Sequence, residues 1–396
     1  MPSKFTCLRA ARLAARHPCR RSFATVTPNR TDHVRIVEVG PRDGLQNEKQ
    51  SIPVATKIEL VERLAQTGLK TIEAGSFVSP KWVPQMENSS EILEYILRTT
   101  PQSPHPITYQ FLLPNVRGLD NFLSVWESRS SKTNAYPTPP PSPGTDGGPA
   151  LNTSSQDPNA MPSASSGFEA MGKERGTSTS TSGPEIELSI FTAATEAFTQ
   201  KNTNCSIAES LHRFEPIMAR AKELDLKVRA YISVALGCPY EGPNVDPHKV
   251  AELAVSLLEM GADEISVADT TGMGTAPKTA ELLKTLSSAG VEKSDLALHF
   301  HDTYGQALVN SVVALEHGIR TFDSAVGGLG GCPFSPGATG NVATEDLVHC
   351  FHSLGAKTGV DIEKLSKVGE WISQELGRAN ESSAGKATLA QLRKRL

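Results

Sequence analysis

The stretch Leu296-Ala-Leu-His-Phe-His-Asp-Thr-Tyr304 decides the fold that this sequence is expected to adopt. It begins as an apolar strand and ends in polar groups, just before a run with helical periodicity. A period-2 strand turns His299 and His301 to the same side, where their imidazoles supply two metal ligands at a fixed separation. Polar groups at the end of a buried strand are typical of the catalytic end of a parallel barrel. The stretch therefore predicts half of a metal site.

A second segment carries residues that can belong to the other half. It is Val34-Arg-Ile-Val-Glu-Val-Gly-Pro-Arg-Asp-Gly-Leu-Gln-Asn-Glu-Lys49. Its first part has the composition of a buried strand, and the strand breaks at Gly40-Pro41 because proline cannot donate to a sheet. Arg42 and Asp43 follow the break, so both are expected at the end of the strand.

A third segment is Thr321-Phe-Asp-Ser-Ala-Val-Gly-Gly-Leu-Gly-Gly-Cys-Pro-Phe-Ser-Pro-Gly-Ala-Thr-Gly-Asn341, a strand followed by a glycine-rich loop. The loop carries Cys332 and Asn341. If the second and third segments hold the first and last strands of a closed barrel, they are neighbours in space, and the His299 strand lies beside the last one. Four side chains can then meet around one cation: Asp43, His299, His301 and Asn341.

Apolar strand-like runs alternate with helix-period runs along the whole chain, which is the pattern of parallel βα units. Strands are expected near 34–39, 71–75, 107–113, 186–191, 227–234, 264–268, 295–301 and 321–326. Helices are expected near 54–67, 87–99, 115–125, 206–224, 247–260, 277–289, 304–317, 342–354 and 362–378. Eight strands predict a (β/α)8 TIM barrel with a short C-terminal helical extension; a doubly wound open sheet is the alternative.

Length and charge are consistent with one large soluble domain. A (β/α)8 barrel needs roughly 250 residues, and the chain has 396, which leaves room for tails and an insertion. The net charge of −4 argues against a nucleic-acid surface. No apolar run approaches the roughly 20 residues that span a bilayer. We therefore expect neither a nucleic-acid partner nor a membrane.

The types of the four candidate ligands indicate the class of metal. Two imidazoles, one carboxylate and one amide oxygen, with water or substrate completing the shell, suit Mg²⁺ or Mn²⁺. A zinc preference would more often recruit thiolates. Mn²⁺ tolerates imidazole better than Mg²⁺ does, so the residues leave the choice between them open.

Long motifs in the chain are similar to those of the 3-hydroxy-3-methylglutaryl-CoA lyases, which belong to a wider family of divalent-metal lyases and synthases on a TIM barrel. The motifs are Gly-Pro-Arg-Asp-Gly-Leu-Gln-Asn-Glu at 40–48, Ser-Phe-Val-Ser-Pro-Lys-Trp-Val-Pro-Gln-Met at 76–86, Ala-Leu-Gly-Cys-Pro-Tyr-Glu-Gly at 235–242 and Gly-Leu-Gly-Gly-Cys-Pro at 328–333. The resemblance runs from about Val34 to about Val360. It matches Asp43 and Asn341 to the family's ligand positions.

The resemblance implies cleavage of a carbon–carbon bond in a β-hydroxy thioester. The metal would bind the hydroxyl and a carboxylate oxygen of the substrate and lower the hydroxyl pKa. Arg42 would place its guanidinium on the thioester carbonyl oxygen, where negative charge develops. Asp43 would act both as a ligand and in the proton path. The alternative for Arg42 is a salt-bridged arginine at the barrel mouth.

Three further residues receive catalytic roles from the same resemblance. Cys332 is expected to be a general acid/base on a flexible glycine loop, with a small residue filling a turn as the alternative. Glu73 ends the second strand, and Glu345 follows Asn341 by four residues; both match acidic active-site positions. Either can orient Arg42, His301 or water.

The sequence contains no phosphate-binding fingerprint that could recognise coenzyme A. Coenzyme A must therefore be bound by contacts spread over several segments. Asn47 and Lys49, just beyond the first strand, are candidates for contacts with its phosphates or pantetheine, and a solvated loop is the alternative. Gly272-Met-Gly274 resembles a substrate-loop position. The family usually has glycine before the equivalent of Asp269, where this chain has Ala268, so the loop path there is in doubt.

The two ends and one internal stretch fall outside the barrel pattern. Residues 1–24 are rich in arginine and lack acidic residues, as in a mitochondrial presequence. The C-terminal Lys-Arg-Leu only loosely resembles a peroxisomal address. The stretch from about residue 127 to residue 183 consists mainly of Pro, Ser, Thr and Gly. A disordered insertion at the bottom of the barrel is therefore expected there. The barrel domain is expected over 33–360, and C-terminal helices and a tail over 361–396.

Three functions are compared. The first is a lyase that cleaves 3-hydroxy-3-methylglutaryl-CoA to acetoacetate and acetyl-CoA in the mitochondrial matrix. The second is a related condensing synthase or an aldolase, for which only about 55 residues after Asn341 leave little room. The third is an inactive barrel that acts as a scaffold. The lyase is favoured because a competent residue fills every metal and catalytic position; its partners are an acyl-CoA substrate and a second copy in a homodimer.

Overall fold

Eight parallel strands form a closed barrel in which neighbours along the chain are also neighbours in the sheet. The computed structural model describes residues 33–132, 183–331 and 340–395. The strands are β1 (Arg35–Glu38), β2 (Thr71–Ser76), β3 (Thr108–Leu112), β4 (Glu185–Ala193), β5 (Lys227–Ser233), β6 (Glu264–Asp269), β7 (Leu296–Phe300) and β8 (Thr321–Ser324). The barrel closes where Arg35–Glu38 of β1 pairs with Thr321–Ser324 of β8. The predicted fold and the predicted adjacency of the first and last strands are confirmed.

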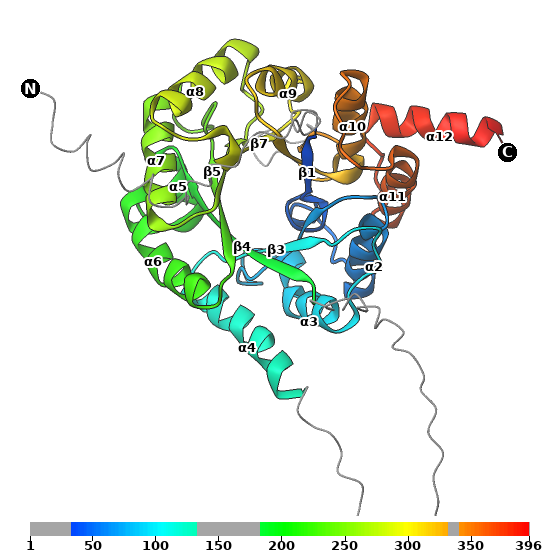
Figure 1. Cartoon of the computed structure of the whole chain (residues 1–396), viewed down its shortest axis with the longest axis horizontal. Helices are drawn as coiled ribbons and strands as arrows, with labels where there is room; N and C mark the ends of the chain where they lie inside the picture. Colours follow the sequence, from blue (N-terminus) through cyan, green and yellow to red (C-terminus); the bar gives the residue numbers. More distant parts are fainter. Residues whose placement is uncertain (1–32, 133–182, 332–339, 396) are drawn as a thin grey trace, which may run out of the picture.

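Helices surround the barrel as an outer ring (Figure 1). They are α2 (Val54–Ala65), α3 (Ser89–Thr99), α4 (Val116–Lys132), α5 (Glu196–Thr203), α6 (Ile207–Glu223), α7 (Pro247–Met260), α8 (Ala276–Ser288), α9 (Ala307–Glu316), α10 (Thr344–Ser353), α11 (Ile362–Glu375) and α12 (Ser383–Arg395). Short turns of other helical types are η2 (Gly40–Gly44), η3 (Pro84–Met86), η4 (Lys293–Asp295) and η5 (Val326–Gly328).

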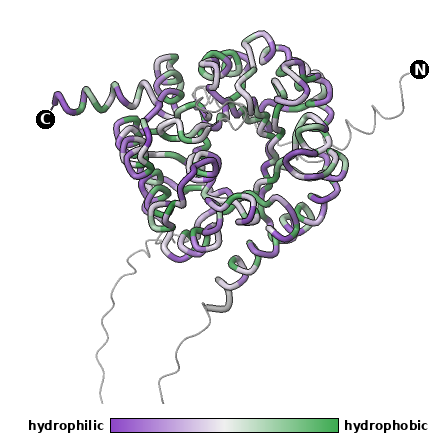
Figure 2. Tube along the Cα trace, turned by 180° about the vertical axis from the view of Figure 1, so that it is seen from behind, coloured by the Kyte–Doolittle hydropathy of each residue, from purple (hydrophilic) through white to green (hydrophobic). Residues whose placement is uncertain are grey.

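Hydrophobic and hydrophilic residues alternate along the helices of the ring (Figure 2), as expected for helices that bury one face against a barrel. Aromatic side chains such as Phe111, Phe122, Phe322 and Phe351 are fully buried in the core. Within the described ranges, no helix is both long enough and apolar enough to cross a bilayer.

The helix α4 differs from the sequence expectation at its end. The sequence predicts an end near Val125 and an insertion from about Glu127, but the helix continues to Lys132. Two contacts support the extension: within the helix, the Trp126 ring stacks on Phe122 with centroids 5.6 Å apart. Glu127 forms an ion pair of 2.8 Å with Arg220 of α6. The rest of the expected insertion, residues 133–182, and the expected presequence, residues 1–24, lie outside the described residues.

Two helices are not predicted individually by the sequence. The sequence of α5 is short and mostly polar, so its period is weak. The helix α12 projects from the ring beside α10 and α11 (Figure 1) and lies within the region where C-terminal helices are expected. Its Arg393 and Arg395 pair with Glu370 and Glu363 of α11. These ion pairs are exposed and contribute little to stability.

Candidate active site

A five-residue π-helical turn places two charged side chains at the mouth of the barrel. The turn η2 follows β1 directly, and all five of its residues are buried. Glycine suits position 40 at its start, because a Cβ there would lie 2.5 Å from Oε1 of the buried Glu38 and displace that carboxylate. The same Glu38 oxygen accepts a hydrogen bond of 2.8 Å from the Gly40 amide. The turn thereby points Arg42 and Asp43 into the site, as single π-turns often do at functional positions.

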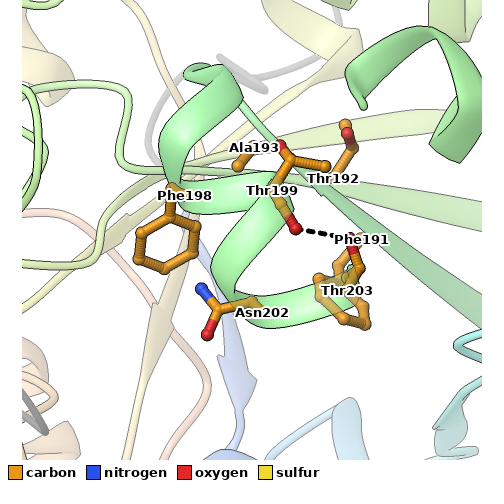
Figure 3. A pocket seen from close by; sticks show the side chains of 7 residues that line it. All are labelled: Phe191, Thr192, Ala193, Phe198, Thr199, Asn202 and Thr203. Atoms are coloured by element: carbon orange, nitrogen blue, oxygen red, sulfur yellow. Dashed lines mark hydrogen bonds between the residues drawn. The ribbon is translucent and has the colours of Figure 1, made fainter. Parts of the chain in front are cut away.

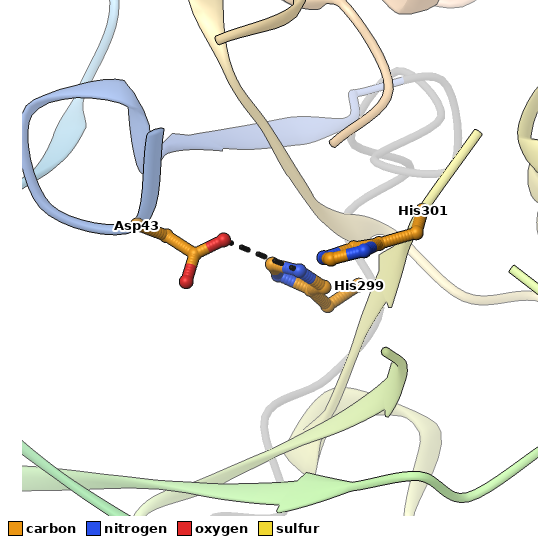
Figure 4. A group of neighbouring side chains, drawn as sticks. All are labelled: Asp43, His299 and His301. Atoms are coloured by element: carbon orange, nitrogen blue, oxygen red, sulfur yellow. Dashed lines mark ion pairs between the residues drawn. The ribbon is translucent and has the colours of Figure 1, made fainter. Parts of the chain in front are cut away.

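Three buried side chains form a group that can hold a metal ion. One donor atom each from Asp43, His299 and His301 lies within 4.8 Å of the others. Figure 4 shows Asp43 facing the two imidazoles, with His299 Nε2 3.9 Å from an Asp43 oxygen. His299 lies in β7, and His301 follows it in a bridge with Asn341. Asn341 Nδ2 donates a hydrogen bond of 2.8 Å to Asp43 Oδ2, so all four predicted ligands lie together.

The chemical state of these residues suits a divalent cation. His301 Nδ1 and Asn341 Oδ1 are buried and have no hydrogen-bond partner in the described part of the chain. Burial lowers the pKa of His301 to about 4, and a positive charge on His299 acts in the same direction. Burial raises the pKa of Asp43, but Arg42, His299 and His301 together lower it below its ordinary value. A neutral imidazole and a carboxylate are the forms that bind a cation.

Arg42 is fixed by two carboxylates beside this group. Its Nε and Nη2 both lie 2.6 Å from Glu73 Oε2. Its Nη1 donates to Asp43 Oδ1 at 2.7 Å. Burial lowers the pKa of Arg42, but the charges of Glu73 and Asp43 outweigh it and hold the pKa above its ordinary value. The guanidinium is therefore a permanent positive charge next to the candidate cation site.

Glu73 is itself held in place from across the barrel. Its second carboxylate oxygen accepts a hydrogen bond of 2.9 Å from Ser189 Oγ of β4. The carboxylate is fully buried, and its contacts with Arg42 and Ser189 orient the guanidinium rather than water. Of the orienting roles considered for Glu73, the geometry favours the one toward Arg42.

Glu345 lies behind the glycine-rich segment and does not contact the group of candidate ligands. Its two oxygens accept from the Gly327 amide at 3.1 and 2.9 Å. Burial raises the pKa of Glu345 to about 8. Glu38 accepts from the neighbouring Val326 amide at 2.9 Å and from Thr344 Oγ1 at 2.7 Å. Two buried carboxyl groups therefore fix consecutive amides at the start of the loop that leads to Cys332.

Cys332 lies outside the described residues, as do the seven positions after it. The residues that flank this segment are close to the site. Leu329 accepts a hydrogen bond of 3.2 Å from Asn341 Nδ2 through its carbonyl. The Gly340 carbonyl accepts from the Asp302 amide at 2.7 Å. The proposed role of Cys332 stays a prediction.

The two candidate coenzyme A contacts lie at the surface beyond η2. Asn47 is exposed, and its Nδ2 donates to the Gly331 carbonyl at 3.3 Å. Lys49 is exposed two residues further along. Asn47 thus lies next to the glycine-rich segment, and the contact of both residues with substrate stays a prediction.

The loop after β6 wraps around Asp269. Asp269 Oδ2 accepts from the Gly274 amide at 2.9 Å, and its Oδ1 is buried without a partner among the residues that the structure describes. Burial raises the pKa of Asp269 to about 6. Gly272 has a φ of +67° and a Cβ there would lie 2.8 Å from Thr303, so glycine is required. Despite Ala268 in place of the family's glycine, the loop thus encloses a buried acid at the carboxyl end of the barrel.

Two charged residues of the barrel interior carry a sequence signal that lies outside the motifs. Arg229 and Asp323 are charged residues inside apolar strands, in Lys-Val-Arg-Ala-Tyr-Ile-Ser (227–233) and Thr-Phe-Asp-Ser (321–324). A charge at a buried strand position indicates a partner in the barrel interior. Gln46, whose Nε2 donates to Asp43 Oδ1 at 2.5 Å, offers no such signal.

A separate cavity between β4 and α5 does not belong to this site. It is lined by Phe191, Thr192, Ala193, Phe198, Thr199, Asn202 and Thr203 (Figure 3). Its volume of about 10 Å³ accommodates about one water molecule. It is too small for an organic substrate.

The fold and the site together define a class: a closed (β/α)8 barrel with a group able to hold a divalent cation at the carboxyl end of its strands. The family model described as HMGL-like matches residues 33–119 and 173–372. The chain therefore belongs to the HMGL-like family.

Curated and solved relatives agree with this assignment. The chain is 44% identical over 358 residues to the 3-hydroxy-3-isohexenylglutaryl-CoA/hydroxy-methylglutaryl-CoA lyase of Pseudomonas aeruginosa, covering 90% of this chain and 98% of the relative. It is 42% identical to the mitochondrial hydroxymethylglutaryl-CoA lyase of Rattus norvegicus, covering 90% and 89%. The crystal structure of the hydroxymethylglutaryl-CoA lyase from Pseudomonas aeruginosa superposes with a TM-score of 0.72 at 42% identity, covering 91% of this chain and 98% of that one.

Proposed function

We propose that this chain is a hydroxymethylglutaryl-CoA lyase that cleaves 3-hydroxy-3-methylglutaryl-CoA to acetoacetate and acetyl-CoA. The observation that carries the proposal is the position of Arg42, whose guanidinium is held between Glu73 and Asp43 at 2.6 and 2.7 Å. Asp43 is at the same time part of the group that can hold a cation. The relatives at 42% and 44% identity carry lyase names, which supports the reaction class.

The reaction requires two proton transfers and the breaking of one carbon–carbon bond. A base removes the proton of the tertiary hydroxyl, and the carbon that bears it becomes a ketone carbonyl. The electron pair of the broken bond passes to the carbon next to the thioester and gives an enolate. An acid then protonates that carbon, which yields acetyl-CoA beside acetoacetate.

The residues of this chain can support each stage. Arg42 is permanently charged and can stabilise the negative charge that develops on the thioester oxygen. Asp43 remains a carboxylate, so it can accept the hydroxyl proton as well as contact a cation. Cys332 is proposed to exchange the proton at the enolate carbon. Glu73 keeps the guanidinium in one orientation throughout.

The proposed cofactor is Mg²⁺ or Mn²⁺, held by Asp43, His299, His301 and Asn341. When bound, it would lower the pKa of the substrate hydroxyl and fix the substrate relative to Arg42. The mixture of two imidazole nitrogens with carboxylate and amide oxygens supports this class of ion. Asn47 and Lys49 are proposed to contact the coenzyme A part at the rim.

The deciding experiment measures acetoacetate release from 3-hydroxy-3-methylglutaryl-CoA by the purified chain starting near Ala24. It compares chelated enzyme, enzyme with Mg²⁺ restored, and Cys332→Ala with Mg²⁺. Cleavage that needs the metal and collapses in the variant supports both the reaction and the thiol. Failure of the metal-loaded wild type to cleave would favour the condensing reaction or the inactive scaffold.

Location and assembly are part of the same proposal. The arginine-rich residues 1–24 and the mitochondrial rat relative support the mitochondrial matrix, with the peroxisome as the alternative from the C-terminal Lys-Arg-Leu. A fluorescent fusion with and without residues 1–24 tests this. We also propose a homodimer, tested by light scattering of the purified chain.

A further inference from the structure

A row of buried polar side chains crosses the barrel interior and ends on one of the candidate metal ligands. Arg229 on β5 donates through Nη2 to Asp323 Oδ1 on β8 at 2.6 Å. Asp323 Oδ2 lies 3.2 Å from Nδ1 of His299 on β7. The side chains of Arg229 and Asp323 are fully buried. His299 therefore has a carboxylate on one ring nitrogen and the group of candidate ligands on the other.

The hydrogen bonds around Asp323 determine which nitrogen of His299 carries the proton. A carboxylate only accepts hydrogen bonds. Asp323 Oδ1 accepts from Arg229, and Oδ2 accepts from Ser266 Oγ at 2.8 Å. His299 can complete the set only by donating from Nδ1. In the neutral ring Nε2 then keeps its lone pair, and this atom is the one 3.9 Å from Asp43 Oδ2.

His301 has no equivalent support. Its Nδ1 is buried and has no hydrogen-bond partner in the part of the chain that the structure covers. The two imidazoles are close neighbours, with ring centroids 5.3 Å apart. Of these two rings, only His299 is thus fixed in one tautomer by a charged partner. Its contribution to cation binding therefore depends on Asp323, which is not one of the candidate ligands.

We propose that Asp323 is a positioning residue that fixes His299 in the Nδ1–H tautomer, with Arg229 as the counter-charge that keeps Asp323 in place. The inference rests on the cation site of the proposed function. A carboxylate behind a histidine ligand commonly raises the affinity of a site for its metal about 10- to 100-fold.

Replacing Asp323 by asparagine tests the tautomer with little change in shape. The Arg229 guanidinium only donates, so the oxygen of the introduced amide would have to face it. The NH₂ group of that amide would then face Ser266 and His299. His299 Nδ1 would have to accept, so its proton would move to Nε2, the nitrogen that faces the cation site.

The experiment uses the full chain labelled with ¹⁵N-histidine, freed of metal by a chelator. Long-range ¹⁵N–¹H spectra distinguish the two tautomers, and the His299 signals are assigned from their absence in His299→Gln. The expected result is the Nδ1–H tautomer in wild type and the Nε2–H tautomer in Asp323→Asn. In parallel, the loss of the free Mn²⁺ signal in electron paramagnetic resonance should show an Mn²⁺ affinity about 10- to 100-fold weaker in Asp323→Asn.

Glu264→Gln is the matched control. Glu264 accepts from the same arginine, through Arg229 Nε at 2.8 Å, but its contacts are with Arg229 and Arg35, not His299. We expect Glu264→Gln to keep the wild-type tautomer. Its affinity for Mn²⁺ should be close to that of wild type, unlike the affinity of Asp323→Asn. An equal loss of affinity in both variants would mean general damage to the barrel and would overturn the proposal.

Wild type alone also decides the matter if Asp323→Asn fails to fold. Finding His299 protonated on Nε2 in the wild-type apo protein would overturn the proposal. Finding it protonated on Nδ1 supports the proposal without any variant. Failure of the proposed function is a separate outcome, because wild type would then release no acetoacetate, or bind no Mn²⁺, while the histidine spectra still report the tautomer.

Discussion

Arg42 and Glu73 are joined by two contacts to a single oxygen: Nε and Nη2 of the guanidinium both lie 2.6 Å from Oε2 of the carboxylate. The two residues come from the turn after β1 and from β2, and both are buried. Because a planar guanidinium held at two nitrogens cannot rotate, its third nitrogen is aimed at Asp43. The geometry of the proposed electrophilic group is thus set by its neighbours before substrate arrives.

Replacing Arg42 by lysine tests whether this geometry matters beyond its charge. Lysine keeps the positive charge, but its single nitrogen cannot reproduce the paired contact of Nε and Nη2 with Glu73 or the fixed guanidinium plane. We expect kcat for cleavage to fall about 10²- to 10³-fold, the cost of losing one well-placed donor in such a site. The readout is acetoacetate release with saturating Mg²⁺.

The control for this variant is Arg98→Lys, an exposed arginine paired with Glu94 on α3. It should cleave at the wild-type rate. Equal activity of Arg42→Lys and wild type would show that the guanidinium plane has no part in catalysis.

Removing the carboxylate of Glu73 is expected to destabilise the fold as well as the site. In Glu73→Ala the buried Arg42 keeps Asp43 as a partner but loses both contacts with Glu73. Removing one partner of a buried ion pair costs about 3 kcal/mol. Urea unfolding followed by circular dichroism measures the loss. Glu59→Ala, which removes an exposed partner of Arg63, should change the free energy of unfolding by less than about 1 kcal/mol. A loss for Glu73→Ala as small as this would argue that the Arg42–Glu73 pair is not buried in solution.

The raised pKa of Glu345 predicts a pH dependence of stability with a definite sign. Burial raises this pKa from an ordinary 4.5 to about 8, so between these values the folded protein holds a proton that the unfolded chain releases. The contribution of Glu345 to the free energy of unfolding is therefore fully present below about pH 4.5 and is lost as the pH rises through about 8. In Glu345→Gln the free energy of unfolding should fall less steeply with pH than in wild type, by up to about 1.4 kcal/mol per pH unit.

Unfolding in urea at several values from about pH 5 to about pH 9 checks this. The comparison variant is Glu363→Gln, an exposed carboxyl on α11 that pairs with Arg395, which should keep the wild-type slope. If wild type and Glu345→Gln lose stability in parallel, Glu345 is already ionised throughout this range.

Metal binding should stabilise the folded protein through the four candidate ligands. At free Mn²⁺ about 100 times its dissociation constant, linkage predicts about 2.7 kcal/mol of added stability. Thermal unfolding with and without Mn²⁺ measures the shift in Tm. His301→Gln should lose most of the shift, whereas His317→Gln, whose ring contacts the Val313 carbonyl at the end of α9, should keep it. A shift of the same size in both variants would place the ion elsewhere.

The strands and the approximate helices could be predicted from the sequence because each is a local pattern. The same is true of His299 and His301, which share one strand face. The contact of Ser189 with Glu73 could not be predicted from the sequence, because it depends on how the strands of the barrel are placed relative to one another. The two residues are 116 positions apart in the chain. The position of Glu345 behind Gly327 also required the fold, since four residues after Asn341 the helix α10 has turned the side chain away from the ligands.

The described residues that flank the 133–182 segment lie at the rim opposite the site. Lys132 ends α4, and β4 begins at Glu185, which pairs with Thr108 at the start of β3, whereas Asp43 and His301 follow the far ends of their strands. The thickness of the barrel thus separates this junction from the chemistry. A reporter protein or new chain termini could be engineered between Lys132 and Glu185, and changes accumulating there in evolution would be screened from selection on catalysis.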